Sequence, residues 1–570
     1  MSKNTEIAEI FEKIADALEF KGDSTFRIGA YRKAARIIKE LPEEIEDIWK
    51  KGELENIPGI GKGMAEKIDE YLKTGKMKKY EETMKGIPEG IIELLDIPNL
   101  GPRTLNLAYN KLNVKNLSDL ERVIEDGSLA KLFGMGEKKV ENIKRGVEIY
   151  KMGKSRIPIG VAIPIVESIV ESLRKYVKKI SPAGSVRRMK ETVGDIDILV
   201  TGENGKEIIE KFVSLPDVKE ILAKGETKGS VIMKKNNLQV DLRVLPEDCY
   251  GAALQYFTGS KAHNIKLRGL AKEKGLKISE YGVFKGNKKI AGKTEEEVYN
   301  SLGLVWIPPE MREDRGEIEL SLEGKLPEVI EEKDIKGDLH IHSKYSDGVN
   351  TIEEIANFAK QIGYEYVGIA DHSKTSKIAN GLDEDELKKR NDEIDELNQK
   401  IKGIKILKGI EVDILGDGSL DYDDKILEEL DFVIAAIHQG FKKDVTKRIK
   451  KAIENPYVDI IAHPTGRLLS GREGYDVDID EVIEYASKYN VVLEINAYPD
   501  RLDLNDVNIM KAKSKNVKFS IGTDAHNIGM LKYIKFGIGM ARRGFLTCLL
   551  YTSDAADEGL GVDLGGRRII

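Results

Sequence analysis

Six of the seven histidines in this chain lie in its last two-fifths, each close to the end of an apolar stretch. A single histidine in such a place is usually a surface or capping residue, but six of seven favour a shared site. With nearby carboxylates they form a set of nine residues: His340, His342, Asp347, His372, Glu411, His438, His463, Asp524 and His526. Imidazoles interleaved with carboxylates are ligands for Zn²⁺ or Mn²⁺, and nine are enough for as many as three ions. Such a cluster activates water at neutral pH and holds a phosphate ester.

A second set of acidic residues lies in the middle of the chain. Asp195 and Asp197 alternate with isoleucine in GDIDILV, which predicts a strand with both carboxylates on one face. Asp241 occupies a similar apolar stretch, LQVDLRVL, and Gly184-Ser185 is placed to turn the chain under a phosphate. Three carboxylates that converge on a sheet are what two Mg²⁺ ions need for in-line phosphoryl transfer to a 3′-hydroxyl. Carboxylates that only solvate a strand are the alternative.

Glycine turns between apolar helical patterns recur three times in the first 150 residues. They occur in IPGIGKGMAEKIDEYL, IPNLGPRTLNLAYNKL and LFGMGEKKVENI, where Asn99 replaces the first glycine of the second copy. The turn glycines are Gly59, Gly61, Gly101, Gly134 and Gly136. Such a turn leaves the backbone N–H groups of the next helix facing a phosphate. One copy is common in ordinary helical proteins, whereas three favour helix-hairpin-helix DNA binding.

The elements that must position the nine metal ligands alternate between apolar strands and amphipathic helices, such as residues 351–362 and 447–454. Strand–helix alternation with polar residues at the strand ends is the layout of a β/α barrel with its site on one face.

The stretch YFTGSKAHNIKLR, residues 256–268, completes a pattern with Gly184-Ser185 and the three carboxylates. The combination resembles family X DNA polymerases, of which DNA polymerase beta is the familiar member, over residues 1–315. The resemblance implies that Asp195, Asp197 and Asp241 hold two Mg²⁺ ions. It also implies that the nucleotide-binding residues are Gly184, Ser185, Arg188, Tyr256, Phe257, Gly259 and Asn264, with Arg268 near the template strand.

Residues 26–35 and 63–76 also resemble the small lyase domain of that family. Lys67 falls where the family has its Schiff-base lysine, which implies 5′-deoxyribose phosphate lyase activity. A solvent-facing lysine on a polar helix is an equal alternative. Arg27 stands where the family often has a lysine that contacts the DNA 5′-phosphate, a change that keeps the phosphate contact.

The nine histidines and carboxylates resemble the PHP (polymerase and histidinol phosphatase) metallohydrolase family over about residues 337–545, with every ligand position filled. A polymerase followed by a PHP domain is the order in bacterial and archaeal family X polymerases. The resemblance implies a manganese-favoured 3′→5′ exonuclease, with AP-endonuclease and 3′-phosphatase action as related reactions. Arg467 in HPTGR is interpreted as a phosphate contact, with a surface arginine as the equal alternative.

Composition fits this interpretation. Of 570 residues, 41% are hydrophobic and 33% charged, which is typical of a soluble multidomain protein. Two cysteines, Cys249 and Cys548, fit a reducing cytoplasm without a disulfide framework. The net charge of −7 divides unevenly: residues 151–245 have 18 basic against 12 acidic residues, and residues 337–570 have 32 against 41. The basic middle would face phosphates, and the acidic end suits a cation-loaded site.

The predicted fold class is multidomain, α+β and α/β, with helical helix-hairpin-helix domains, a nucleotidyltransferase palm with a mixed β-sheet, and a distorted β/α barrel. The expected domains are a DNA-binding, lyase-like domain at 1–85, a second helical domain at 86–150, the palm at 151–245, a nucleotide-binding subdomain at 246–320, a linker at 321–336, the PHP barrel at 337–547 and a tail at 548–570. The tail sequence resembles translated sequencing adapter, so we interpret it as an artefact; a natural disordered tail is the alternative.

The sequence therefore predicts a cytoplasmic, monomeric DNA-repair enzyme without a membrane segment. It would use deoxynucleoside triphosphates to fill short gaps in gapped or nicked DNA, and it would trim 3′ ends with the barrel. Two alternatives are a polymerase fused to a small-molecule or pyrophosphate phosphatase, and a non-catalytic scaffold for DNA ends.

Overall fold

The computed structural model describes residues 3–39, 41, 45–57, 59–87, 90–91, 94–97, 100–151 and 156–548. Asn99 and residues 549–570 of the predicted tail lie outside the described residues. The chain forms two compact units, Met1–Ser155 and Arg156–Ile570. None of the described helices has the length and apolar character needed to cross a bilayer.

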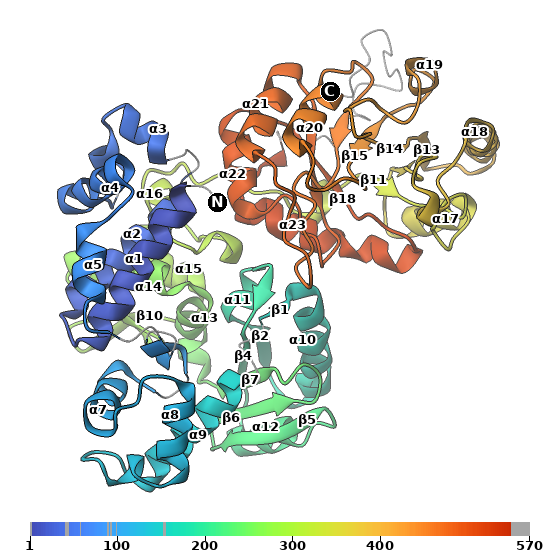
Figure 1. Cartoon of the computed structure of the whole chain (residues 1–570). Helices are drawn as coiled ribbons and strands as arrows, with labels where there is room; N and C mark the ends of the chain where they lie inside the picture. Colours follow the sequence, from blue (N-terminus) through green and yellow to red (C-terminus); the bar gives the residue numbers. More distant parts are fainter. Residues whose placement is uncertain are drawn as a thin grey trace. The chain divides into compact units, whose positions relative to one another are not determined.

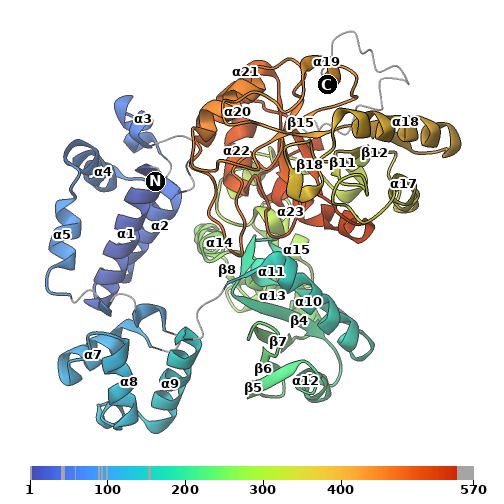
Figure 2. The same cartoon turned by 45° about the vertical axis from the view of Figure 1, so that its right-hand side comes forward.

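The first unit is helical (blue in Figures 1 and 2). Its α-helices with printed bounds are α1 (Lys3–Phe20), α2 (Thr25–Lys39), α3 (Ile45–Lys50), α4 (Lys62–Thr74), α5 (Lys78–Met84), α7 (Pro102–Leu112), α8 (Leu117–Glu125) and α9 (Glu137–Lys151). Apolar residues three or four apart on α1, such as Ile7, Phe11 and Ile14, are fully buried in a first core. The last residue of α1, Phe20, packs instead in a second core, where its ring lies 5.6 Å from that of Tyr109. One helix therefore contributes to both cores.

The second unit begins with a five-stranded mixed sheet. Its strands are β2 (Lys179–Pro182), β4 (Asp195–Thr201), β5 (Val218–Lys224), β6 (Lys228–Met233) and β7 (Gln239–Val244), in the order β2-β4-β7-β6-β5. Only β4 and β7 pair in parallel. Ile196 and Ile198 pack in the core with helices α10 (Ile159–Leu173) and α12 (Gly205–Val213), whereas Leu199 packs in a different core with α13 (Tyr250–Thr258). Strand alternation therefore places Asp195 and Asp197 on the face away from α10 and α12.

A small subdomain follows the sheet. It contains α14 (Lys261–Glu273), the antiparallel strands β8 (Lys277–Ser279), β9 (Gly282–Lys285) and β10 (Lys288–Ala291), and helices α15 (Glu295–Ser301) and α16 (Glu317–Leu322). The seventh histidine, His263, is fully buried here. Its Nδ1 lies 2.6 Å from Glu317 Oε1 and its Nε2 lies 3.0 Å from the Tyr299 hydroxyl. It joins three helices of this subdomain and is no part of the metal cluster.

The rest of the second unit is a parallel barrel wrapped by helices. Its strands are β11 (Gly337–Ile341), β12 (Tyr366–Ile369), β13 (Lys405–Lys408), β14 (Glu411–Asp413), β15 (Ile434–Ala436), β16 (Ile460–Ile461), β17 (Val492–Asn496) and β18 (Phe519–Gly522). The main helices around it are α17 (Ile352–Gln361), α18 (Glu384–Lys400), α20 (Val445–Ile453), α21 (Ile479–Tyr489), α22 (Asp506–Ser514) and α23 (Ile534–Arg543). All strand pairs are parallel, and bridges from Ile341 to Ala525 and from His372 to Glu411 connect the two sheets. The predicted combination of helical domains, mixed sheet and α/β domain is confirmed.

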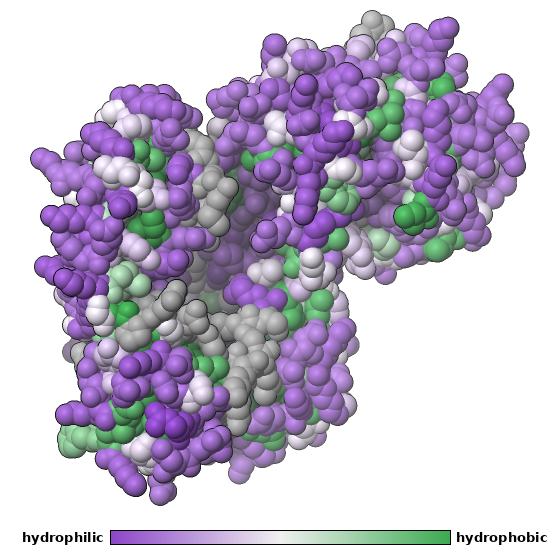
Figure 3. All heavy atoms as spheres, viewed as in Figure 1, coloured by the Kyte–Doolittle hydropathy of each residue, from purple (hydrophilic) through white to green (hydrophobic). Residues whose placement is uncertain are grey.

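One core of the barrel contains Phe432, which packs closely against two glycines. Phe432 is fully buried, and a Cβ at Gly409 or Gly368 would lie 2.0 or 2.5 Å from its Cζ. Glycine is therefore required at both positions. On the face of the molecule drawn in Figure 3, hydrophobic side chains are scattered among hydrophilic ones, as on most protein surfaces.

Candidate active sites

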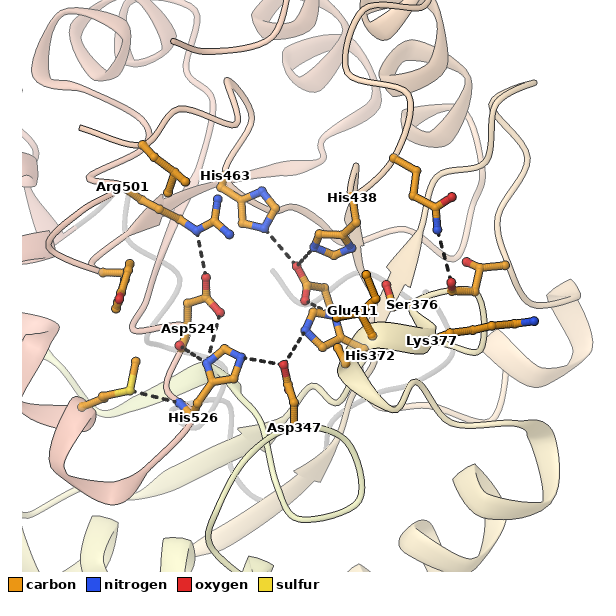
Figure 4. Close-up of a pocket in the computed structure, with 17 residues that line it drawn as sticks. Asp347, His372, Ser376, Lys377, Glu411, His438, His463, Arg501, Asp524 and His526 are labelled. Carbon is orange, nitrogen blue, oxygen red and sulfur yellow. Dashed lines mark hydrogen bonds and ion pairs between the residues drawn. The ribbon is translucent and has the colours of Figure 1, made fainter. Parts of the chain in front are cut away.

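The nine predicted metal ligands lie together, in strands β11 and β14 and in segments that follow strands, with Asp347 in the loop after β11. They line or border a pocket of about 1030 Å³, in which histidines and carboxylates from different strands point toward one another (Figure 4). Three groups have candidate ligand atoms that all lie within 4.8 Å of one another. The groups are His342, Asp347, His372 and His526; His340, His342 and Asp524; and His372, Glu411 and His438.

Glu411 is the central carboxylate of this cluster. Its two oxygens lie 3.0 Å from His372 Nδ1, 3.1 Å from His463 Nε2 and 3.3 Å from His438 Nε2. Asp347 has a similar bridging place, with Oδ2 3.3 Å from His526 Nε2. A carboxylate that faces several imidazoles is placed to ligate more than one cation.

Several buried polar atoms of the cluster have no hydrogen-bond partner. They are Nε2 of His340, both ring nitrogens of His342, Nδ1 of His463 and Oε2 of Glu411. Leaving such an atom buried and unpaired costs about 1–3 kcal/mol, so the set fits direct ligation of cations rather than structural hydrogen bonding. The donor set of imidazoles and carboxylates suits Mn²⁺ or Zn²⁺.

Neighbouring carboxylates favour the protonated form of two imidazoles in the cluster, those of His438 and His526. Burial lowers the pKa of His438, but Glu411 and Asp413 outweigh it and raise that pKa to about 10. Burial also opposes protonation of His526, yet Asp347 raises its pKa to about 9. Without cations, protons on these imidazoles balance the carboxylates, and bound metal ions would replace those protons.

A further layer of carboxylates orients the ligands. Glu494 Oε1 lies 2.5 Å from His340 Nδ1, and Glu494 Oε2 accepts a hydrogen bond from the His463 backbone. Asp413 Oδ1 lies 2.5 Å from His438 Nδ1. Such partners fix the imidazole tautomer and its direction. Neither carboxylate was predicted from the sequence, although an acidic residue inside an apolar strand (VVLEIN, GIEVDIL) was an available signal.

The three palm carboxylates lie on neighbouring strands. Asp197 and Asp241 are partners in the parallel β4–β7 pairing. Burial, together with the charges of Asp195 and Asp241, raises the pKa of Asp197 to about 7. Within the described part of the chain, the palm carboxylates are not among the groups whose ligand atoms approach within 4.8 Å, unlike the barrel set.

Asp241 has its own partners. Lys228 Nζ lies 3.2 Å from Asp241 Oδ2, and Ser230 and Gln239 donate hydrogen bonds to Oδ1. Although burial opposes this, these contacts lower the pKa of Asp241, so it is the carboxylate of the three that stays ionised most readily.

The predicted Gly-Ser turn lies directly against these carboxylates. Gly184 has φ +61°, and a Cβ there would lie 2.9 Å from Asp197 Oδ2, so only glycine fits. Ser185 follows in the short helix α11 (Gly184–Arg187). The sequence pattern and the geometry agree on this turn.

The turn glycines of the first unit precede helices as the pattern predicts. Gly59 and Gly134 have left-handed φ values of +91° and +74°. Gly61 and Gly101 are the N-caps of α4 and α7, whose ends have neither a side-chain cap nor an acidic residue in the first turn. Gly136 immediately precedes α9. Uncapped first-turn N–H groups are available to an anion.

Comparisons with known proteins connect these features. Residues 2–77 match a helix-hairpin-helix domain, 91–148 a SAM-like helix-hairpin-helix tandem, 253–313 the DNA polymerase beta thumb and 338–498 the PHP domain. Over 548 residues, 95% of either chain, the sequence is 42% identical to the DNA polymerase/3′-5′ exonuclease PolX of Bacillus subtilis (strain 168). The chain belongs to the PolX family.

Parts of this PolX-family chain also resemble other proteins. It is 28% identical over 349 residues to DNA polymerase lambda of Arabidopsis thaliana, covering 54% of this chain and 62% of that one. It is also 36% identical over 204 residues to a probable phosphatase of Thermoanaerobacter sp. (strain X514), covering 33% of this chain and 78% of that one. Parts of the chain are therefore similar both to a polymerase and to a protein named as a probable phosphatase.

Arg188, predicted to contact the triphosphate, is buried in an ion pair in this structure. Its Nε lies 2.9 Å from Glu313 Oε1 and its Nη1 donates to the Thr258 carbonyl at 2.7 Å. Glu313 Oε1 also lies 3.1 Å from Nη1 of Arg543, at the end of barrel helix α23. The triphosphate contact stays a prediction, and it requires Arg188 to exchange Glu313 for phosphate.

The other predicted nucleotide-binding residues lie around the end of α13. The rings of Tyr256 and Phe257 are 5.1 Å apart. The Asn264 amide donates to the carbonyls of Tyr256 at 2.7 Å and Gly259 at 3.0 Å, so it holds this turn in place. Arg268 is exposed on α14. The nucleotide and template contacts of these residues stay predictions.

Arg467 has protein partners in this structure, and its predicted phosphate contact stays a prediction. It ion-pairs with Glu191 at 2.8 Å and donates to the carbonyls of Arg501 and Leu502, and it is not among the residues that line the metal pocket. Arg501 lines the pocket instead, with Nε 3.1 Å from Asp524 Oδ2 and a buried Nη1 that has no hydrogen bond. It was missed because its loop, PDRLD, follows none of the strand-end patterns.

Lys67 lies on α4, partly exposed, and its Nζ donates to the Gly63 carbonyl of the same helix. Arg27 Nη1 lies 3.1 Å from Asp23 Oδ2 on an exposed surface. Neither contact distinguishes a Schiff-base lysine from a surface lysine, so lyase activity stays a prediction.

Proposed function

We propose that this chain is a DNA polymerase that fills short gaps during DNA repair and a 3′→5′ exonuclease that trims 3′ ends with its barrel. The observation that carries the proposal is the presence in one chain of both residue sets, the palm carboxylates beside the Gly184-Ser185 turn and the nine-residue barrel cluster. Its substrates would be gapped or nicked DNA and deoxynucleoside triphosphates, and it would act as a monomer in the cytoplasm.

In the palm, Asp195, Asp197 and Asp241 would hold two Mg²⁺ ions. When bound, these ions would stabilise the charge that develops on the attacking and leaving oxygens. Asp241 is suited to ligate these cations, since its hydrogen bonds from Ser230 and Gln239 keep it ionised. Arg188 and the first turn of α11 would face the triphosphate.

In the barrel, the nine ligands would hold up to three Mn²⁺ or Zn²⁺ ions. These ions would supply activated water and neutralise the scissile phosphate. Arg501 is placed to donate its unpaired Nη1 to a phosphate oxygen, and Asp524 holds its Nε in position. The same arrangement suits cleavage at abasic sites and removal of 3′-phosphates, which we include as related reactions of this site. We also propose lyase action by Lys67 as a secondary activity.

A second candidate for the barrel is a phosphatase that acts on small molecules or pyrophosphate, because a third of this chain is similar to the probable phosphatase from Thermoanaerobacter. A one-nucleotide gap with a labelled primer separates the candidates. Mg²⁺ and deoxynucleotide should give extension by one residue, and Mn²⁺ alone should give stepwise loss of 3′ nucleotides. Hydrolysis of pyrophosphate without any trimming of DNA would favour the phosphatase.

A further inference from the structure

The turn at residues 373–381 is tied to the metal cluster by side-chain hydrogen bonds. Asp413, which holds His438, also accepts hydrogen bonds from Thr375 Oγ1 at 2.6 Å and Ser376 Oγ at 3.0 Å. The Asp413 N–H in turn donates to Ser373 Oγ at 2.9 Å. Gly381 closes the turn, since a Cβ there would lie 1.9 Å from the Ser373 carbonyl oxygen. The turn is therefore held in a defined position beside His438.

The turn presents an isoleucine to solvent. Ile378, in the 3₁₀ helix η8 (Lys377–Ala379), has a relative exposure of 104%, the highest of the large hydrophobic residues in the described part of the chain. It also lines the metal pocket. Exposed hydrophobic residues are common singly on surfaces. This one differs because an anchored turn holds it at the edge of a site whose floor is made of imidazoles and carboxylates.

Other apolar residues line the same pocket from other elements. Leu468, Tyr498 and Met530 are partly buried lining residues. Tyr498 begins the turn that contains Arg501, because the Arg501 N–H donates to its carbonyl at 2.8 Å. Figure 4 shows Arg501 and Lys377, the neighbour of Ile378, on opposite sides of the ligand cluster. The pocket thus combines a charged floor with an apolar rim.

A site with charged ligands below and apolar side chains at its edge suits phosphate compounds that also have an apolar part. The pocket volume of about 1030 Å³ is at the upper end of the roughly 300–1,000 Å³ usual for small-ligand sites. Inorganic phosphate and pyrophosphate have no apolar surface for the rim to contact. A nucleotide at a strand end has a phosphate for the floor and a flat, apolar base for the rim.

We propose that Ile378 is a specificity residue that packs against the base of the 3′-terminal nucleotide while its phosphate lies on the metal ligands. The proposal rests on the exonuclease activity proposed above and names the part of the substrate that the rim recognises. The Ile378 side chain is apolar and fully exposed, so it cannot ligate a metal ion, and we expect its effect on substrate selection rather than on the metal site.

The test compares two substrates with the full-length Mn²⁺-loaded enzyme. One is a single-stranded oligonucleotide with an ordinary 3′-terminal nucleotide, and the other is the same strand ending in a tetrahydrofuran residue that lacks a base. Ile378→Ser should lower kcat/KM for the ordinary end by about tenfold, which corresponds to roughly 1.4 kcal/mol of lost contact, with at most a twofold change for the baseless end. Ile378→Leu should retain wild-type preference.

Ile362→Ser is the matched control, because Ile362 is 40% exposed in the same barrel and does not line the pocket. It should leave both substrates unchanged, and a thermal melt should show all three variants folded. An equal loss on both ends, or no loss on either, would overturn the role of Ile378 while wild-type trimming stands. Failure of the wild-type enzyme to trim either end would overturn the exonuclease proposal, and this inference with it.

Discussion

The palm and the barrel both offer ligands for divalent cations, but only the barrel ligands already lie close enough together to surround an ion. The barrel cluster has groups of ligand atoms within 4.8 Å of one another, buried imidazole nitrogens without hydrogen bonds, and outer carboxylates that fix their direction. The palm carboxylates stand on one face of an open sheet, and one of them is paired with Lys228.

The difference shows which part of each site the protein itself supplies. Mg²⁺ usually keeps waters and takes substrate phosphates as ligands, so a site with few carboxylates is completed by the bound nucleotide. A histidine-rich cluster holds its metals without substrate. We therefore expect the barrel to be loaded in free enzyme and the palm to be assembled only with DNA and triphosphate.

The largest effect is expected from Asp241→Ala. This change removes a carboxylate that would hold the Mg²⁺ ions against the developing charge, so gap filling should fall by about a thousandfold or more, at least about 4 kcal/mol in the transition state. Primer extension on a one-nucleotide gap measures it. Binding to gapped DNA should stay within a few-fold, and Mn²⁺-dependent trimming should remain. Near wild-type extension would refute the assignment of the palm carboxylates.

Glu411→Gln should affect the barrel site and leave the palm site intact. Glu411 faces three imidazoles and would itself ligate the cations. Loss of an outer hydrogen-bond partner of a metal ligand typically lowers metal affinity or activity by roughly 10- to 100-fold, and the change at Glu411 should lower them further. Trimming should fall by more than a hundredfold, and elemental analysis should show less Mn²⁺ per chain. Gap filling with Mg²⁺ should be unchanged. A variant that keeps its full metal content would contradict the bridging role.

Asp413→Asn should give a smaller effect of the same kind. The amide keeps the size of the carboxylate but holds His438 less strongly, so Mn²⁺ affinity should fall by about 10- to 100-fold. Equilibrium titration with Mn²⁺ measures the change, and excess Mn²⁺ should restore trimming. If excess metal does not restore trimming, Asp413 acts mainly by anchoring the turn at residues 373–381, and the assignment of its effect to His438 is wrong.

The smallest expected effect is the release of protons from the barrel cluster when it binds metal ions. The pKa values of His438 and His526 are raised to about 10 and 9, so both imidazoles carry protons at pH 7 in cation-free protein. Metal binding should release these protons, and Mn²⁺ affinity should rise as the pH increases from 7 toward 9. Calorimetry in buffers of different ionisation enthalpy counts the protons. A pH-independent affinity over this range would contradict the charge balance described for the cluster.

The sequence was informative where chemistry follows a regular element. Most of the nine barrel ligands lie in or just after strands, and Asp195, Asp197 and Gly184 belong to one short motif, so local sequence patterns were enough to find them. The predicted fold class was confirmed for the same reason. The domain boundaries and individual site roles stay predictions.

What could not be predicted depends on distant segments that meet only after folding. Glu494 is 154 residues from His340, and Arg188 is 125 residues from Glu313. The partner of Arg467, Glu191, belongs to the palm and could not be found from the sequence, and Arg501 reaches the pocket from a loop without periodicity. Residue type alone did not distinguish the arginine at the site from the arginine that joins the palm and the barrel.

The most direct test of two separate sites compares two variants on the same gapped substrate. His340→Ala combined with His342→Ala removes ligands only from the barrel, and Asp195→Ala removes one only from the palm. We predict that the first variant loses 3′ trimming with Mn²⁺ but fills the gap with Mg²⁺ at near wild-type rate, and that the second does the reverse while its barrel metals remain bound. Loss of trimming in the Asp195 variant with full barrel metal content would show that trimming belongs to the palm, and would contradict this account.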